Sequence, residues 1–104
     1  RKQLRHMVGI ERWGQRRLRT ALGEPLLMDE MDGYMPPEQT PVPDLAAALA
    51  AARAETVVLA RQLDARGIPL DATVPHNQFG PLTARGWLVY LNAHANREVN
   101  LVRR

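Results

Sequence analysis

Residues 44–66 read DLAAALAAARAETVVLARQLDAR, and this stretch decides the fold class of the 104-residue chain. Six of its residues recur at alternating spacings of three and four, which places them on one face of a helix: Leu45, Leu49, Ala52, Thr56, Leu59 and Leu63. Alanine, the residue of highest helix propensity, is the commonest residue at the other positions. Asp44 is a suitable N-cap after Pro43, and Gly67 followed by Pro69 is a suitable stop. We therefore expect one long helix whose leucines belong to the core of a helical bundle.

Two further segments have helical periodicity, one before and one after this stretch. The first spans residues 2–22 and ends at Gly23, with Pro25 close behind. Its broad apolar arc comprises Leu4, Met7, Val8, Ile10, Gly14, Leu18, Ala21 and Leu22. The second begins after Thr83, a suitable N-cap, and continues toward Arg104. Strand signals are lacking, so we expect an all-α bundle with no sheet.

The connections between these helices are irregular in composition. Residues 24–43 contain Met-Pro-Pro and Thr-Pro-Val-Pro, which break any long element. Twenty residues are long for a connection in a compact domain, and such loops are often functional. Residues 68–81 form the second connection, in which we expect Phe79 to anchor the loop to the core.

Composition is that of an ordinary soluble domain, with 45% hydrophobic and 24% charged residues. The chain has no cysteine, which excludes disulfides, thiolate metal sites and a cysteine nucleophile. A reducing compartment is compatible with this, and we expect a cytoplasmic protein. No apolar run approaches the roughly 20 residues of a membrane span, so we expect no contact with a membrane.

Basic residues crowd the first twenty positions of a chain whose net charge is +3: Arg1, Lys2, Arg5, Arg12, Arg16, Arg17 and Arg19. One interpretation is a phosphate-binding surface. The other is the solvated face of an amphipathic helix, which we favour because no nucleic-acid-binding motif accompanies the run. Nucleic acid is therefore not an expected partner.

His94 and Glu98 interrupt the apolar face of the last helical segment. At about 100° per residue they share one arc with Trp87, Leu91, Leu101 and Val102. Burying an uncompensated carboxylate costs several kcal/mol or more, so a partner is required. Two partners fit the spacing. One is a metal ion bound by both residues from one helix face, and the other is a hydrogen-bonded His–Glu pair.

The last third of the chain resembles the DinB-like family. Its residues Pro75-His76-Asn77-Gln78-Phe79-Gly80-Pro81-Leu82-Thr83, then Trp87-Leu88 and His94-x-x-x-Glu98, are similar to the family ending. In that ending a Phe-Gly-Pro-Leu-Thr turn leads into a tryptophan-bearing helix with His-x-x-x-His. The segment from His6 to Trp13 resembles the family's other signature, a helix with His followed by Glu and Trp. Together the similar regions cover nearly the whole chain.

The resemblance implies an up-down four-helix bundle that binds a divalent metal through one histidine on an early helix and two on the last. By position the ligands here are His6, His94 and Glu98, with Glu98 standing where the family has histidine. Two histidines and one carboxylate are still a competent ligand set. The metal is left open among zinc, nickel, manganese and iron.

The resemblance also bears on the extent of the domain. The chain begins inside the first signature, so we expect residues 1–104 to be a single DinB-like domain that lacks one N-terminal helix. An apolar flank would then be uncovered. We expect a homodimer to cover it.

Three further polar or aromatic positions have two interpretations each. Glu11, near the centre of the first apolar arc, either accepts a hydrogen bond from a ligand imidazole or pairs with one of the neighbouring arginines. His76 either approaches the metal or a substrate or, as we favour, bonds local backbone in a turn. Trp87 and Tyr90 are expected in the core or an interface rather than against substrate.

Two functions follow from these expectations. The first is a metal-dependent enzyme, a thiol S-transferase or a hydrolase, because characterised relatives of this kind use low-molecular-weight thiols. The second is a non-catalytic helical bundle, an interaction or stress-response protein with a degenerate metal site. No catalytic base can be named from the sequence.

Overall fold

The computed structural model describes residues 2–69 and 71–92. Helix α1 (Lys2–Thr20) is followed by the short 3-10 helix η1 (Met31–Tyr34) and helix α2 (Val42–Ala65). Strands β1 (Thr73–His76) and β2 (Gly80–Thr83) come next, and residues 84–92 are helical. The described chain is mostly helical, which agrees with the expected class, but it does not establish the expected four-helix bundle.

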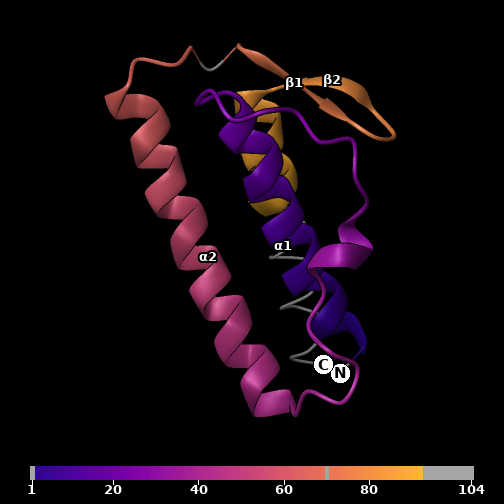
Figure 1. Ribbon diagram of the computed structural model, residues 1–104. Coiled ribbons are helices and arrows are strands. Elements are labelled where there is room, and N and C mark those ends of the chain that lie inside the picture. Colours follow the sequence, from indigo (N-terminus) through magenta and orange to yellow (C-terminus); the bar gives the residue numbers. More distant parts are fainter. Residues whose placement is uncertain (1, 70, 93–104) are drawn as a thin grey trace.

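Helices α1 and α2 lie side by side and run in the same direction (Figure 1). Their N-terminal halves pack together, since Leu4 and Val8 share a cluster with Leu45 and Leu49. This parallel course corrects the expected up-down order, in which consecutive helices run antiparallel. It requires a connection that returns along the bundle. The 19 residues of α1 span roughly 28 Å at about 1.5 Å per residue. Residues 21–41 cover this distance, which explains why the first connection is long.

Arginines of α1 hold this returning connection through its backbone. Arg5 donates from Nε to the Pro36 carbonyl at 2.6 Å, Arg12 donates to the Tyr34 carbonyl, and Arg16 donates to the Pro25 carbonyl. Arg17 is buried and bonds the same connection. The favoured interpretation of the basic run as a solvated face is therefore incomplete, because several of its guanidinium groups are structural donors.

The predicted stripe of α2 is confirmed: the buried residues of this helix are Leu45, Leu49, Ala52, Thr56, Leu59 and Leu63. The N-terminal boundary differs, because Pro41 occupies the N-cap and Asp44 lies in the first turn. A carboxylate there is favourable beside the positive end of the helix dipole. The predicted stop is correct, since Gly67 has φ of 68° directly after the C-cap Arg66.

The larger core cluster joins both long helices to the hairpin and to the start of the last helix. It contains Ile10, Trp13, Leu18, Leu59, Leu63, Val74, Ala84, Trp87 and Leu91. Gly14 permits the closest contact, since a Cβ there would lie 2.5 Å from a Leu91 methyl carbon. Trp87 is fully buried and donates its indole N–H to the Val74 carbonyl at 2.9 Å, as expected for a core residue. The helical segment 84–92 is thereby seated on α1.

A two-stranded antiparallel sheet corrects the expectation of no sheet. Thr73 pairs with Thr83, and His76 pairs with Gly80. Strands of four residues are too short to show an alternating pattern, and Pro75 faces Pro81 in the ladder. Both features hide the strands from periodicity arguments. Thr83 still caps the last helix as predicted, because its Oγ1 accepts the Gly86 N–H at 2.9 Å.

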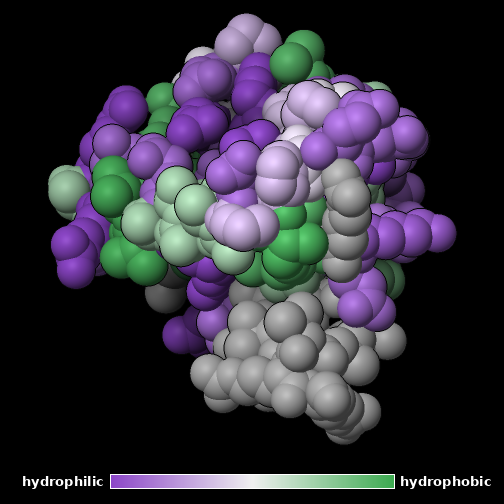
Figure 2. Space-filling model, turned by 90° about the horizontal axis from the view of Figure 1, so that it is seen from below, coloured by the Kyte–Doolittle hydropathy of each residue, from purple (hydrophilic) through white to green (hydrophobic). Residues whose placement is uncertain are grey.

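Apolar residues also lie on the outer surface of α2. Val42, Val57 and Val58 are exposed there, between exposed alanines. Figure 2, which views the molecule from below, shows apolar residues on that face interrupted by polar ones. Within the described residues, no helix is long and apolar enough to cross a membrane.

Candidate functional site

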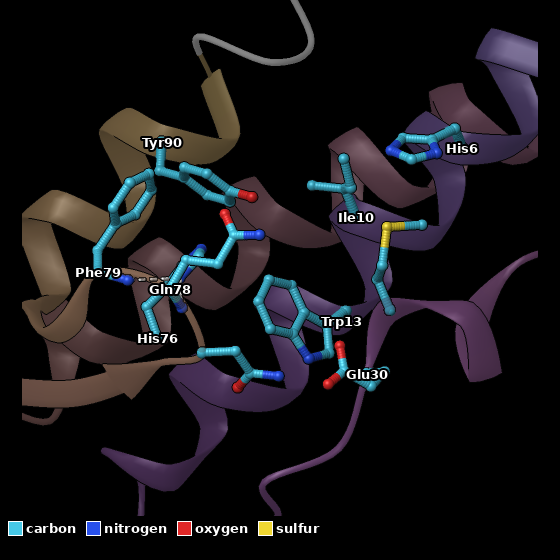
Figure 3. A pocket seen from close by; sticks show the side chains of 10 residues that line it. His6, Ile10, Trp13, Glu30, His76, Gln78, Phe79 and Tyr90 are labelled. Carbon is cyan, nitrogen blue, oxygen red and sulfur yellow. Dashed lines mark hydrogen bonds between the residues drawn. The ribbon is translucent and has the colours of Figure 1, made fainter.

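A cavity of about 470 Å³ lies between α1, η1, the hairpin turn and the last helix. Its walls are formed by His6, Ile10, Trp13, Glu30, Met31, His76, Asn77, Gln78, Phe79 and Tyr90. Figure 3 shows Trp13 at its base, with Phe79, Gln78 and Tyr90 on one side and Ile10 and His6 on the other. Residues from four separate parts of the chain therefore meet around one space.

Helix α1 provides one wall through three residues on a single face. His6, Ile10 and Trp13 are separated by four and three positions, so their side chains point to the same side of the helix. Ile10 and Trp13 are buried, whereas His6 is exposed and lines the cavity. Within the described part of the chain no hydrogen bond engages the His6 ring. Its imidazole lone pair is thus available to a ligand in the cavity.

His76 ends strand β1 and is 4% exposed. Its Nδ1 accepts the backbone N–H of Gln78 at 3.0 Å and that of Phe79 at 3.3 Å. This contact matches the favoured interpretation of His76 as a turn residue. An Nδ1 that accepts two hydrogen bonds carries no proton, so the ring is in the neutral form with its hydrogen on Nε2.

The imidazole of His76 is also enclosed by aromatic rings. Its centroid lies 5.1 Å from that of Trp13, 5.0 Å from that of Trp87 and 4.6 Å from that of Phe79. The expectation that Phe79 anchors the loop is wrong, because Phe79 is 59% exposed. The anchor is His76, and Phe79 is held over it at the edge of the cavity.

Glu11 is buried as predicted, at 2% exposure, but it does not line the cavity. Arg53 of α2 pairs with it at 3.1 Å, and the Thr56 hydroxyl donates to its other oxygen. Gln15 donates to the Thr56 oxygen at 2.9 Å, and Arg53 also donates to Asn92 at 3.1 Å. Of the two interpretations of Glu11, the structure therefore shows an arginine pair. Its partner lies 42 positions away rather than in the neighbouring run.

Arg17 is a residue whose role the sequence did not reveal. It is 1% exposed and donates to the carbonyls of Leu27, Asp29 and Pro75 at 2.9, 3.1 and 2.6 Å. It also donates to Asn77 Oδ1 at 2.5 Å. One guanidinium therefore joins the connection that carries Glu30 to the hairpin turn that carries Phe79. The only sequence signal was its spacing, four residues after Trp13 and three after Gly14.

Burial also sets the electrostatics around the cavity. It lowers the pKa of Arg17, an effect that the neighbouring Asp29 opposes, and arginine remains charged at neutral pH in any case. Desolvation raises the pKa of Tyr90, so its phenol keeps its proton at neutral pH. Tyr90 was expected in the core or an interface. It lies half-buried on the cavity wall, where its hydroxyl points into the space (Figure 3).

The structure describes only part of the predicted metal centre. His94 and Glu98 lie outside the described residues, so the structure places His6 alone of the three predicted ligands. Among residues 2–69 and 71–92, no group of three histidine, aspartate or glutamate side chains has the geometry to hold a metal ion. The metal centre formed by His6, His94 and Glu98 stays a prediction.

Comparison with known families gives one match. The family model described as the DinB superfamily matches residues 1–101, which includes His6, the cavity residues, His94 and Glu98. Neither the curated proteins nor the solved structures provide a significant match. The resemblance noted from the sequence is confirmed at the level of the superfamily.

Proposed function

The chain belongs to the DinB superfamily, and from that membership we propose that it is a divalent-metal-dependent enzyme acting on a small molecule in the cavity. His6, His94 and Glu98 are its proposed metal ligands. Two imidazoles and a carboxylate form a ligand set that suits zinc, nickel, manganese or iron. The proposed reaction is thiol S-transfer or hydrolysis.

One observation carries this proposal: His6 and Tyr90 line the same cavity, although they lie far apart in the sequence. His6 supplies an imidazole without a hydrogen bond in the described structure. His94 follows Tyr90 by four positions, the spacing at which two residues of a helix share a face. Donor chemistry and spacing thus fit a metal held at the His6 end of the cavity.

A bound divalent ion would supply Lewis acidity, polarising a substrate or lowering the pKa of a thiol or water. The other roles belong to this chain's own side chains. Trp13, Ile10 and Met31 form apolar walls of the cavity, against which the apolar part of a substrate would pack. Tyr90 keeps its proton at neutral pH, and its hydroxyl faces the same space.

Metal analysis of the protein purified without a histidine tag tests this proposal. We expect a near-stoichiometric divalent metal in the wild type, and at least about tenfold weaker retention in His6→Ala and Glu98→Gln. Asp64→Asn removes a carboxylate from an exposed position on α2 and serves as the control, since it should retain metal fully. Equal retention by His6→Ala would remove His6 from the site. A wild type that retains no added zinc, nickel, manganese or iron would favour the non-catalytic bundle.

A further inference from the structure

The residues that line the cavity include a carboxylate but no lysine or arginine. Of the residues that line it, Glu30 is the only carboxylate, and no lysine or arginine contributes a side chain, although the chain contains 14 of them. The guanidinium of Arg17 lies 5.0 Å from the centroid of Trp13. It does not line the cavity, and it is committed to backbone carbonyls and Asn77. The described walls therefore offer no fixed positive charge to an anion.

Glu30 differs from its neighbour Asp29 in how its charge is compensated. Asp29 accepts the Tyr34 hydroxyl and lies 3.8 Å from Arg17 Nη2. Glu30 is exposed, and no described lysine, arginine or histidine lies within ion-pair distance of it. Figure 3 shows its carboxylate beside Trp13 at the edge of the space. Arg17 interacts electrostatically with Glu30 but forms no ion pair with it, so the carboxylate can also act on a molecule in the cavity.

Aromatic rings cover the opposite side. Phe79 is 59% exposed, and Tyr90 stands near it with the ring centroids 6.1 Å apart in an edge arrangement. His76 fixes the backbone on which Phe79 stands. Exposed aromatic faces attract cations through their quadrupole, and they also bind the apolar groups that surround an ammonium nitrogen.

From this combination we infer that the cavity binds an organic cation, an ammonium group carried on a small apolar body. The rings of Phe79 and Tyr90 contact the ammonium, and Glu30 supplies the opposing charge. A volume of about 470 Å³ is in the range of small-molecule sites.

This inference deepens the proposed function and rests on it for the role of the ligand as a substrate. It assigns an ammonium group to the molecule that contacts the described walls, whereas a thiol cosubstrate would be held by the metal. The binding itself depends only on described residues, so it is measured separately from metal content.

Choline and its uncharged carbon isostere, in which carbon replaces the ammonium nitrogen, are the matched probes. Each is titrated into the full chain, and binding is followed by NMR at the Trp13 indole N–H and the backbone amides of Gln78 and Phe79. We expect choline to bind at least about tenfold more tightly than the isostere. Only choline gains the cation–π attraction to the rings and the attraction to the Glu30 carboxylate. Equal affinities, or no binding of choline, would overturn the inference.

Two variants locate the binding. Glu30→Gln should weaken choline about five- to tenfold and leave the isostere unchanged, whereas the control Asp64→Asn should bind choline like the wild type. Phe79→Leu keeps an apolar side chain but removes the ring, and it should weaken choline about two- to fivefold. Both changes are at exposed positions, so the fold should persist, as circular dichroism will show. Unchanged choline affinity in Glu30→Gln and Phe79→Leu would refute the assignment.

The same titrations in the presence and absence of a chelator separate the two proposals. A protein that retains metal but does not bind choline contradicts this inference alone. A protein that binds choline and retains no metal contradicts the proposed enzyme alone, and the cavity is then a binding pocket.

Discussion

Helix α1 makes two very different interfaces. Against α2 it packs a regular stripe of apolar side chains, in which Leu59 is fully buried, around the ion pair of Glu11 and Arg53. Against residues 25–36 it makes a set of arginine hydrogen bonds to backbone carbonyls. In the first interface, both helices contribute specific side chains. In the second, only the arginines of α1 are specific to the contact, because every residue of the connection has the same backbone carbonyl.

The difference has a consequence for stability. Loss of an apolar side chain between α1 and α2 affects the whole bundle. Loss of an arginine donor releases the connection and the cavity wall attached to it. Global unfolding measures the first effect, and local hydrogen exchange measures the second.

The largest effect is expected from Leu59→Ala, which leaves a cavity in the main core where Leu59 has no exposed surface. The free energy of unfolding should fall by about 2–5 kcal/mol. Urea denaturation followed by circular dichroism measures it. A loss below about 0.5 kcal/mol would mean that the α2 stripe does not carry the core.

Arg17→Met should cost less globally, about 1–3 kcal/mol, because methionine retains apolar contact while the carbonyls of Leu27, Asp29 and Pro75 lose a charged donor. The diagnostic result is local. Backbone amides in residues 25–36 and 76–79 should exchange much faster, while those of α2 change little. Uniform acceleration across the protein would show that Arg17 supports the whole fold instead of the cavity walls.

Thr83→Ala removes the hydroxyl that accepts the Gly86 N–H at the start of the last helix. The expected cost is about 1 kcal/mol. Thr83→Ser keeps the oxygen and should cost only a small part of that. Thermal unfolding of both variants decides the matter, and equal destabilisation would assign the effect to the lost methyl group.

The smallest effect on folding is expected at the outer surface of α2, which neither interface covers. Self-association of the chain stays a prediction, and the exposed Val57 and Val58 are its proposed contact. Val58→Lys should leave the free energy of unfolding within about 0.5 kcal/mol while shifting the chain toward monomer. Light scattering at micromolar concentration tests this. A wild type that is strictly monomeric would exclude the homodimer.

Periodicity made the helices predictable because a helix that buries one face must repeat its apolar residues at the helical period. The stripe from Leu45 to Leu63 is confirmed for that reason. The stop at Gly67 and the Thr83 cap are confirmed because residue type alone indicates them. Family signatures identified His6 and His76 as residues of interest, and both line the cavity. Glu30 was not identified from the sequence, since a single residue in an irregular connection has no period.

The sequence by itself determined the helical class of this protein, its core stripe and its superfamily. Only the tertiary structure decided the parallel course of α1 and α2, the small hairpin and the use of arginines as backbone clamps. It also decided that His6, Glu30, Phe79 and Tyr90 share one cavity. The physical reason is that apolar burial depends on residue type and therefore leaves a pattern in the sequence. A hydrogen bond to a backbone carbonyl depends only on where the chain passes, and that is known once the chain has folded.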